Sequence, residues 1–117
     1  LSNPVYDPFQ ILTKIYSDGA HVKQAIADTY IEEQYRSRTV KIVYGVLEND
    51  GYFDFCIRHY APKAPKLAVR ILLKISLYIG SIMPLNSTAI SFGGMQIVCS
   101  SVKALKLKFF NPVELFS

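Results

Sequence analysis

Apolar residues recur every three or four positions through the first two-thirds of the chain, which is the period of an amphipathic α-helix. Val40, Val43, Tyr44 and Leu47 form the clearest run of this kind. The sequence Asn49-Asp50-Gly51 follows that run directly and is a strong signal for the end of a helix. The pattern therefore predicts helices separated by short turns over this part of the chain.

Capping residues divide the helical pattern into segments. Asp7 and Pro8 provide an N-cap and a first-turn proline, and Gly19 provides a C-terminal stop. Two prolines make residues 61–65 a stiff connector, because each proline disfavours helical geometry in the residue before it. The predicted helices run from about residue 8 to 17, 20 to 31, 37 to 48, 52 to 59 and 65 to 79.

The fifth predicted helix is apolar on nearly every side, which is typical of a helix at the centre of a bundle. The longest apolar stretch, residues 67–83, contains Arg70 and Lys74 and is short for a bilayer. We therefore expect a core helix here and no membrane span.

The last third of the chain does not keep one hydrophobic period. Glycines and prolines interrupt the pattern over residues 80–97, and Ile97-Val98-Cys99 would suit a strand equally well. A sixth helix over residues 98–107 is the alternative to that strand, and the sequence leaves the choice open. Asn111-Pro112 provides the N-cap and first-turn proline of a last helix. The expected fold is a single all-α domain over residues 1–117, an orthogonal bundle of six or seven short helices.

Composition narrows the class of protein. Half of the 117 residues are apolar, which is sufficient for one packed domain. Cys56 and Cys99 are too few for a disulfide framework, so we expect small buried side chains in a reduced, cytoplasmic protein. Residues 1–7 have neither the basic start nor the apolar run of a signal peptide, and none is expected there.

The net charge of +4 is distributed unevenly along the chain. Residues 1–57 contain five basic and eight acidic residues, a net charge of −3. Residues 58–117 contain eight basic residues and one acidic residue, a net charge of +7. A basic half suggests a polyanionic partner, nucleic acid before membrane. The alternative is a solvated basic surface that maintains solubility.

Seven basic residues are the candidates for phosphate contacts. They are Arg36, Arg38, Lys41, Lys63, Lys66, Arg70 and Lys74. The first three are predicted at the start of the third helix, where amide donors and the helix dipole favour phosphate. Pairing of the two arginines with Glu32 and Glu33 is the alternative. Lys66, Arg70 and Lys74 recur every four residues along the fifth helix, and Lys63 extends this stripe backwards. The stripe is expected to reach solvent by snorkelling, or simply to form the solvated edge of the helix.

No catalytic or metal-binding pattern is present, because two histidines are too few for a metal site and Cys56 has no histidine suitably spaced. His21 and His59 are expected to cap or pack. Tyr6, Tyr16, Tyr30 and Tyr35 are candidates for base stacking, although core packing is the expectation for each of them. Gly45 is expected to allow close approach of a neighbouring helix, and Asp54 to favour the first turn of the fourth helix.

One segment resembles a known family. Its characteristic residues are Arg36-Ser37-Arg38, Val43-Tyr44-Gly45-Val46-Leu47, Asp54 and Leu72-Leu73-Lys74-Ile75-Ser76-Leu77-Tyr78. With this pattern residues 36–78 resemble the NusB-like family, and Phe109-Phe110-Asn111 resembles its closing motif. In the segment that corresponds to residues 79–108, the family normally has an Ala-Lys helix. Lys103-Ala104 matches that helix only weakly.

The resemblance implies an all-α domain that binds RNA and has no catalytic residues of its own. One branch of the family is the N-terminal domain of ribosomal RNA cytosine-5 methyltransferases. Resemblance to this branch implies that the chain is a fragment of a longer protein. A catalytic domain that binds S-adenosylmethionine would then follow in cis beyond Ser117. The other branch is a free-standing transcription antitermination factor that binds a short single-stranded RNA and a protein partner. A protein-interaction or dimerisation module without RNA is the third alternative, and self-association stays open.

Overall fold

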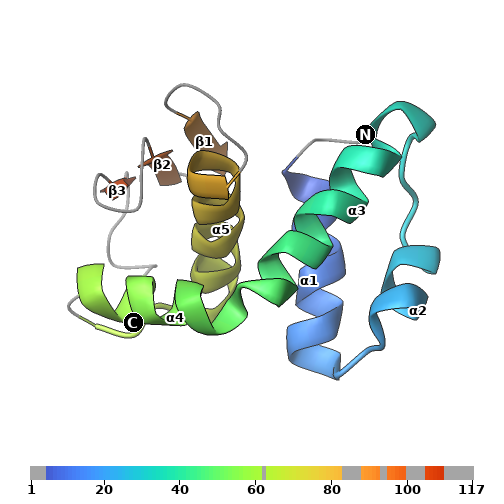
Figure 1. Cartoon of the computed structure of the whole chain (residues 1–117), viewed down its shortest axis with the longest axis horizontal. Helices are drawn as coiled ribbons and strands as arrows, with labels where there is room; N and C mark the ends of the chain where they lie inside the picture. Colours follow the sequence, from blue (N-terminus) through green and yellow to red (C-terminus); the bar gives the residue numbers. More distant parts are fainter. Residues whose placement is uncertain (1–4, 62, 83–87, 93–94, 100–104, 110–117) are drawn as a thin grey trace. The chain divides into compact units, whose positions relative to one another are not determined.

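The computed structural model describes residues 5–61, 63–82, 88–92, 95–99 and 105–109 (Figure 1). Over these residues it contains five α-helices, one π-helical turn and three β-strands. The chain divides into two compact units, Leu1–Glu48 and Asn49–Ser117. The first contains α1 (Tyr6–Asp18), α2 (Val22–Ala27) and α3 (Glu33–Glu48). The second contains α4 (Asp50–Tyr60), α5 (Leu67–Leu77), the π turn η1 (Tyr78–Ile82), β1 (Thr88–Phe92), β2 (Met95–Cys99) and β3 (Leu105–Phe109).

The two ends of α1 follow from local sequence. The helix begins at Tyr6, so Asp7 and Pro8 lie in its first turn and Val5 is the N-cap, one or two residues earlier than expected. Gly19 adopts a left-handed conformation with φ of 68°, which glycine reaches without steric cost. Its N–H donates to the carbonyl of Ile15 at 3.2 Å. The predicted stop at Gly19 is confirmed.

The second helix is shorter than predicted, ending at Ala27 instead of about residue 31. The hydroxyl of Thr29 donates to the carbonyl of Ala25 at 2.9 Å and accepts from the ammonium of Lys14 at 2.8 Å. These side-chain bonds replace further helical turns, as threonine side chains commonly do near helix ends. His21 is the N-cap, and its Nδ1 accepts the backbone N–H of Lys23 at 3.4 Å. The expected capping role of His21 is therefore confirmed.

The core of the first unit lies where α1 contacts α2 and α3. Its buried apolar residues are Ile11, Leu12, Ala25, Ile31, Ile42, Val43 and Val46. α3 begins at Glu33, four residues before the predicted start, because its first turn is polar and exposed and gives no hydrophobic signal. The predicted end is confirmed, since Asn49 alone separates α3 from α4.

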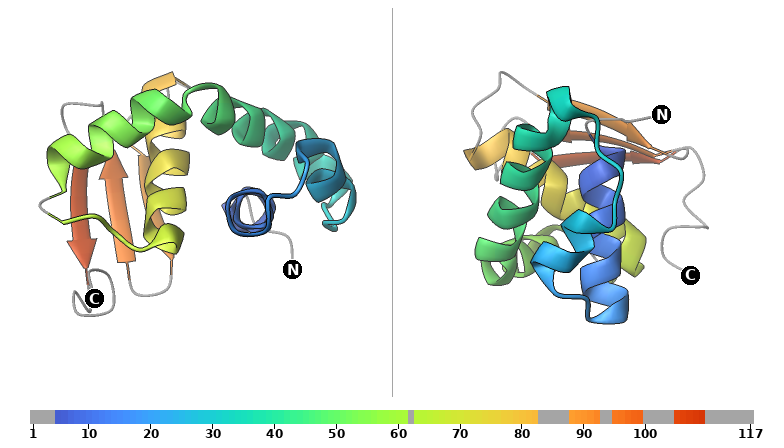
Figure 2. Two further views of the ribbon diagram at one scale, coloured as in Figure 1. Left: turned by 90° about the horizontal axis from the view of Figure 1, so that it is seen from below. Right: turned by 90° about the vertical axis from the view of Figure 1, so that its right-hand side faces the viewer.

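The helices of the second unit match the hydrophobic pattern closely. The predicted buried face of α4 is confirmed, with Phe53, Cys56 and Ile57 at most 3% exposed. Every residue from 71 to 80 is buried, as expected for a helix enclosed on nearly all sides. α5 contacts both α4 and β2 (Figure 2). The second unit therefore has α5 at its core.

Residues 88–109 differ from the prediction. β1, β2 and β3 form an antiparallel sheet in that order, with Phe92 opposite Met95 and Met95 opposite Phe109. The helix predicted over residues 98–107 is wrong, whereas the alternative of a strand at residues 97–99 is confirmed. The local reason is visible in the sequence of β3, Leu-Lys-Leu-Lys-Phe, which alternates with the period of a strand. Only Gly93-Gly94 separates β1 from β2, a length and composition typical of tight hairpins.

The all-α expectation is thus confirmed for residues 5–82, and the sheet replaces the expected helical end of the bundle. The strands also depart from the helical pattern of the NusB-like family in this segment. The last predicted helix, at Asn111-Pro112, lies outside the described residues. The expectation of a single domain stays a prediction.

Gly45 provides a test of packing in α3, where it is buried. We expect Gly45→Leu to lower the free energy of unfolding by about 1–3 kcal/mol or more, because a well-packed site has no room for four extra carbons. Urea denaturation followed by circular dichroism measures the change. Gly51→Leu is the matched control, since Gly51 lies exposed in α4 and its added Cβ meets nothing within 4 Å. Equal stability of the two variants would contradict the packing role.

Candidate functional site

The seven candidate residues fall into two sets in different units. Arg36, Arg38 and Lys41 lie on α3 in the first unit. Lys63, Lys66, Arg70 and Lys74 lie on the connector and on α5 in the second unit.

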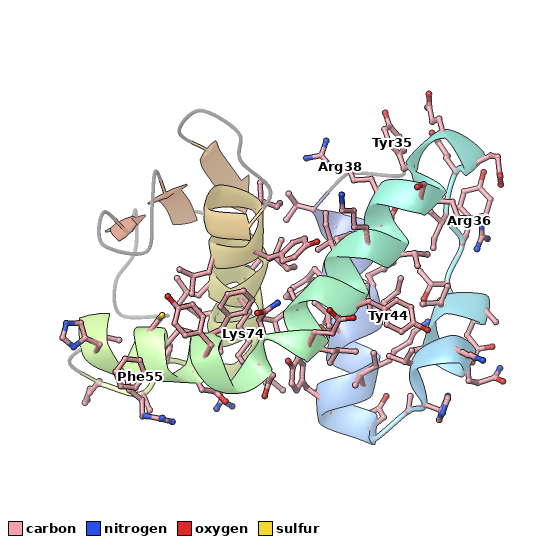
Figure 3. All side chains as sticks on the ribbon, in the orientation of Figure 1. Tyr35, Arg36, Arg38, Tyr44, Phe55 and Lys74 are labelled. Carbon is pink, nitrogen blue, oxygen red and sulfur yellow. The ribbon has the colours of Figure 1, made fainter. Side chains whose placement is uncertain are left out.

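The α3 set does not form one cluster. Residues two apart on a helix face different directions, and Figure 3 shows Arg36 and Arg38 extending to different sides of α3. Arg36 pairs with Glu33 at 3.7 Å, which confirms the alternative of local ion pairing for this residue. Both side chains are largely exposed, so the pair contributes at most about 1 kcal/mol.

Arg38 and Lys41 are three residues apart and share a face of α3. Both are exposed. Because α3 begins at Glu33, they lie beyond its first turn, so the expected help from amide donors at the helix start is wrong. Their contribution to a polyanion site rests on charge alone.

Lys74 is not available as a phosphate ligand. Its side chain is only 6% exposed, and its Nζ lies 2.7 Å from Oδ1 of Asp50 and 3.0 Å from Oδ1 of Asp54 (Figure 3 labels Lys74). The predicted snorkelling of Lys74 to solvent is therefore wrong. A buried ammonium needs opposite charge close by, and α4 supplies two carboxylates. Asp54 lies beyond the first turn of α4, so its expected role at the helix start is wrong too; it pairs with Lys74.

The ion pairs of Lys74 predict an asymmetric response to mutation. Asp50→Asn and Asp54→Asn together remove both ion pairs from a buried ammonium, and we expect a loss of about 3–5 kcal/mol in stability. Lys74→Met leaves two carboxylates that are 37% and 34% exposed and remain hydrated. It should therefore destabilise less. Urea unfolding of both variants tests the order, and a larger loss in Lys74→Met would contradict it.

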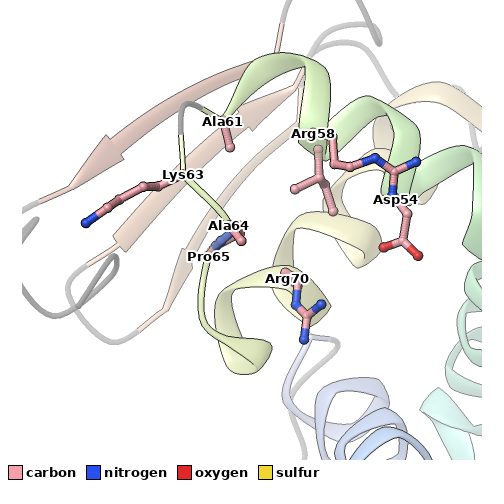
Figure 4. A pocket seen from close by; sticks show the side chains of 8 residues that line it. Asp54, Arg58, Ala61, Lys63, Ala64, Pro65 and Arg70 are labelled. Carbon is pink, nitrogen blue, oxygen red and sulfur yellow. The ribbon is translucent and has the colours of Figure 1, made fainter.

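A cavity of about 420 Å³ lies in the second unit, where the end of α4, the connector and the start of α5 meet (Figure 4). Its charged lining residues are Asp54, Arg58, Lys63 and Arg70. Ile57, Ala61 and Pro65 form part of its apolar lining. Lys66 is exposed at the N-cap of α5 and is not one of the lining residues. The structure thus brings Lys63 and Arg70 of the predicted set to one place.

Arg58 is the residue that the sequence prediction missed. It lies in the last turn of α4 and lines the cavity together with Arg70 of α5. The signal for it was the proline-containing connector, because a short stiff turn brings the end of one helix close to the start of the next. The basic charge of residues 58–117 begins at this same arginine.

Two aromatic side chains, one in each unit, are largely exposed. Tyr30 is 79% exposed and Phe55 is 61% exposed. The expectation of core packing is therefore wrong for Tyr30. The ring of Phe55 stacks on that of His59, with centroids 6.5 Å apart and an interplanar angle of 13°. This confirms that His59 packs.

The described residues contain no group of three or more His, Cys, Asp and Glu side chains placed to hold a metal ion. Cys56 is a free, buried thiol, as expected; the side chain of Cys99 lies outside the description. In the described part of the chain, no helix combines the length and apolar character needed to cross a membrane.

Comparison with known proteins adds no relative. No protein-family model matches the chain, and no significant match was found to a curated protein or to a solved structure.

Proposed function

We propose that this chain is an RNA-binding domain that contacts the phosphate backbone through exposed basic side chains. The observation that carries the proposal is positive charge without acidic partners. Arg38, Lys41, Lys63 and Lys66 are exposed, and among the described residues no carboxylate forms an ion pair with any of them. Unneutralised Lys and Arg side chains supply most of the affinity of proteins for nucleic acids.

Exposed aromatic rings support RNA over other polyanions. Unpaired bases stack on aromatic side chains, and Tyr30 and Phe55 present most of their surface to solvent. A polyanion without bases would make no use of such rings.

The resemblance of residues 36–78 to the NusB-like family favours ribosomal RNA as the target. The structure has helices α3, α4 and α5 over this segment, with Tyr78 directly after α5. More specifically, we propose that the domain positions ribosomal RNA for a cytosine-5 methyltransferase domain in cis. That catalytic domain lies outside this chain and binds S-adenosylmethionine. A cytoplasmic location follows from that role and agrees with the reduced thiol of Cys56.

The dependence of RNA affinity on salt tests the proposal. We expect the logarithm of the association constant for a single-stranded ribosomal RNA fragment to fall linearly with the logarithm of salt concentration. Lys66→Gln should weaken binding to all sequences and reduce that slope by about one, because one phosphate contact is lost. Fluorescence anisotropy at several salt concentrations gives both quantities.

Lys23→Gln is the matched control, since Lys23 is exposed, lies in α2 and is outside the candidate set. An equal loss in Lys23→Gln, or no binding near physiological salt, would reject the proposal. Strong preference for one short RNA sequence together with a protein partner would favour the antitermination factor instead. Self-association in size-exclusion chromatography without RNA binding would favour an interaction module.

A further inference from the structure

The cavity at the start of α5 carries an excess of positive charge. Arg58, Lys63 and Arg70 border it, and Asp54 is its acidic lining residue. The carboxylate of Asp54 is already paired, since Nζ of Lys74 lies 3.0 Å from its Oδ1. Among the described residues, no ion pair neutralises any of the three cations. A concave, positively charged site of this kind attracts anions.

Arg70 is the residue that points most directly to a ligand. Its Nε is buried and has no hydrogen-bond partner among the described residues. Buried polar groups in native proteins nearly always have a partner, so an unsatisfied one in a cavity wall calls for an oxygen from outside the chain. Arg70 comes from α5 and Arg58 from α4, and Figure 4 shows the side chain of Lys63 extending from the connector away from both arginines.

The start of α5 also favours an anion at this place. No side chain caps this helix of 11 residues, although Lys66 occupies its N-cap position. The first-turn amides and the helix dipole therefore favour a negative charge there. Two guanidinium groups add the planar donor forks that bind phosphate in a bidentate manner.

We propose that this cavity binds a single phosphate group, held by the guanidinium groups of Arg58 and Arg70, with Lys63 at its rim. Either an RNA strand or a free phosphorylated ligand offers this chemistry. The inference rests on the proposed function only where RNA is the source of the phosphate. Because Ile57, Ala61 and Pro65 also line the cavity, a phosphate ester covers more of its surface than inorganic phosphate does.

Titration of the full chain with inorganic phosphate, uridine monophosphate and uridine tests the site. We expect saturable binding of uridine monophosphate, weaker binding of inorganic phosphate and none of uridine, measured by calorimetry or by heteronuclear NMR. Arg70→Gln and Arg58→Gln should each weaken uridine monophosphate binding about tenfold or more, because each removes a charge-assisted hydrogen bond. Lys23→Gln, in the other unit, should leave it unchanged.

A thermal melt of each variant accompanies the titration. Arg58 is exposed, so Arg58→Gln keeps the test decisive even where Arg70→Gln fails to fold. No saturable binding of either phosphate probe, or an equal loss in Lys23→Gln, overturns the phosphate site.

Competition with RNA separates the two sources of phosphate and the two proposals. Displacement of uridine monophosphate by the RNA fragment assigns the site to RNA, and lack of displacement assigns it to a free phosphorylated ligand. If Arg58→Gln and Arg70→Gln leave the RNA affinity unchanged and neither phosphate probe binds, the phosphate site is overturned. The proposed RNA-binding function then still stands. Uridine monophosphate binding without any RNA binding supports the phosphate site and rejects the proposed RNA-binding function.

Discussion

The arrangement of the second unit depends on one buried charge. The ammonium of Lys74 is almost completely enclosed, and it is held between the carboxylates of Asp50 and Asp54 on the neighbouring helix. Desolvating an ammonium group is costly, so the arrangement is stable only while both carboxylates stay within hydrogen-bond distance. That requirement holds the first two turns of α4 against the last turn of α5. It also explains how a charged residue is tolerated in a helix whose residues 71–80 are all buried.

The same constraint shapes the candidate site. With α4 held against α5, Arg58 and Arg70 line one cavity although they are twelve positions apart in the sequence. Lys74 pairs with Asp54, the acidic residue in that lining, and so offsets part of the negative charge that faces the two arginines. Lys74, which the sequence suggests as a phosphate ligand, thus acts indirectly by forming an ion pair with Asp54.

The helical part of the fold was accessible from sequence because its signals are local. The stops at Gly19 and Asn49, the buried face of α4 and the enclosed α5 all follow from periodicity and from backbone preferences of single residues. The sheet was missed because two periods compete in this segment. Residues 97–99 are consistent with a strand or a helix, and the spacing of Val98, Val102 and Leu105 also fits one face of a helix. Pairing of β2 with β1 and β3 decided the outcome, and such pairing is a non-local interaction.

Sequence alone therefore determined the helices over residues 5–82, the basic character of the second half and the candidate arginines and lysines. It could not decide which of these charges are free, because spacing along one helix does not show what a neighbouring helix supplies. Lys66, Arg70 and Lys74 recur at the same interval, yet the first is exposed, the second lines a cavity and the third is buried between two carboxylates. Only the packing of α4 against α5 separates these roles, since burial and pairing are properties of two elements together.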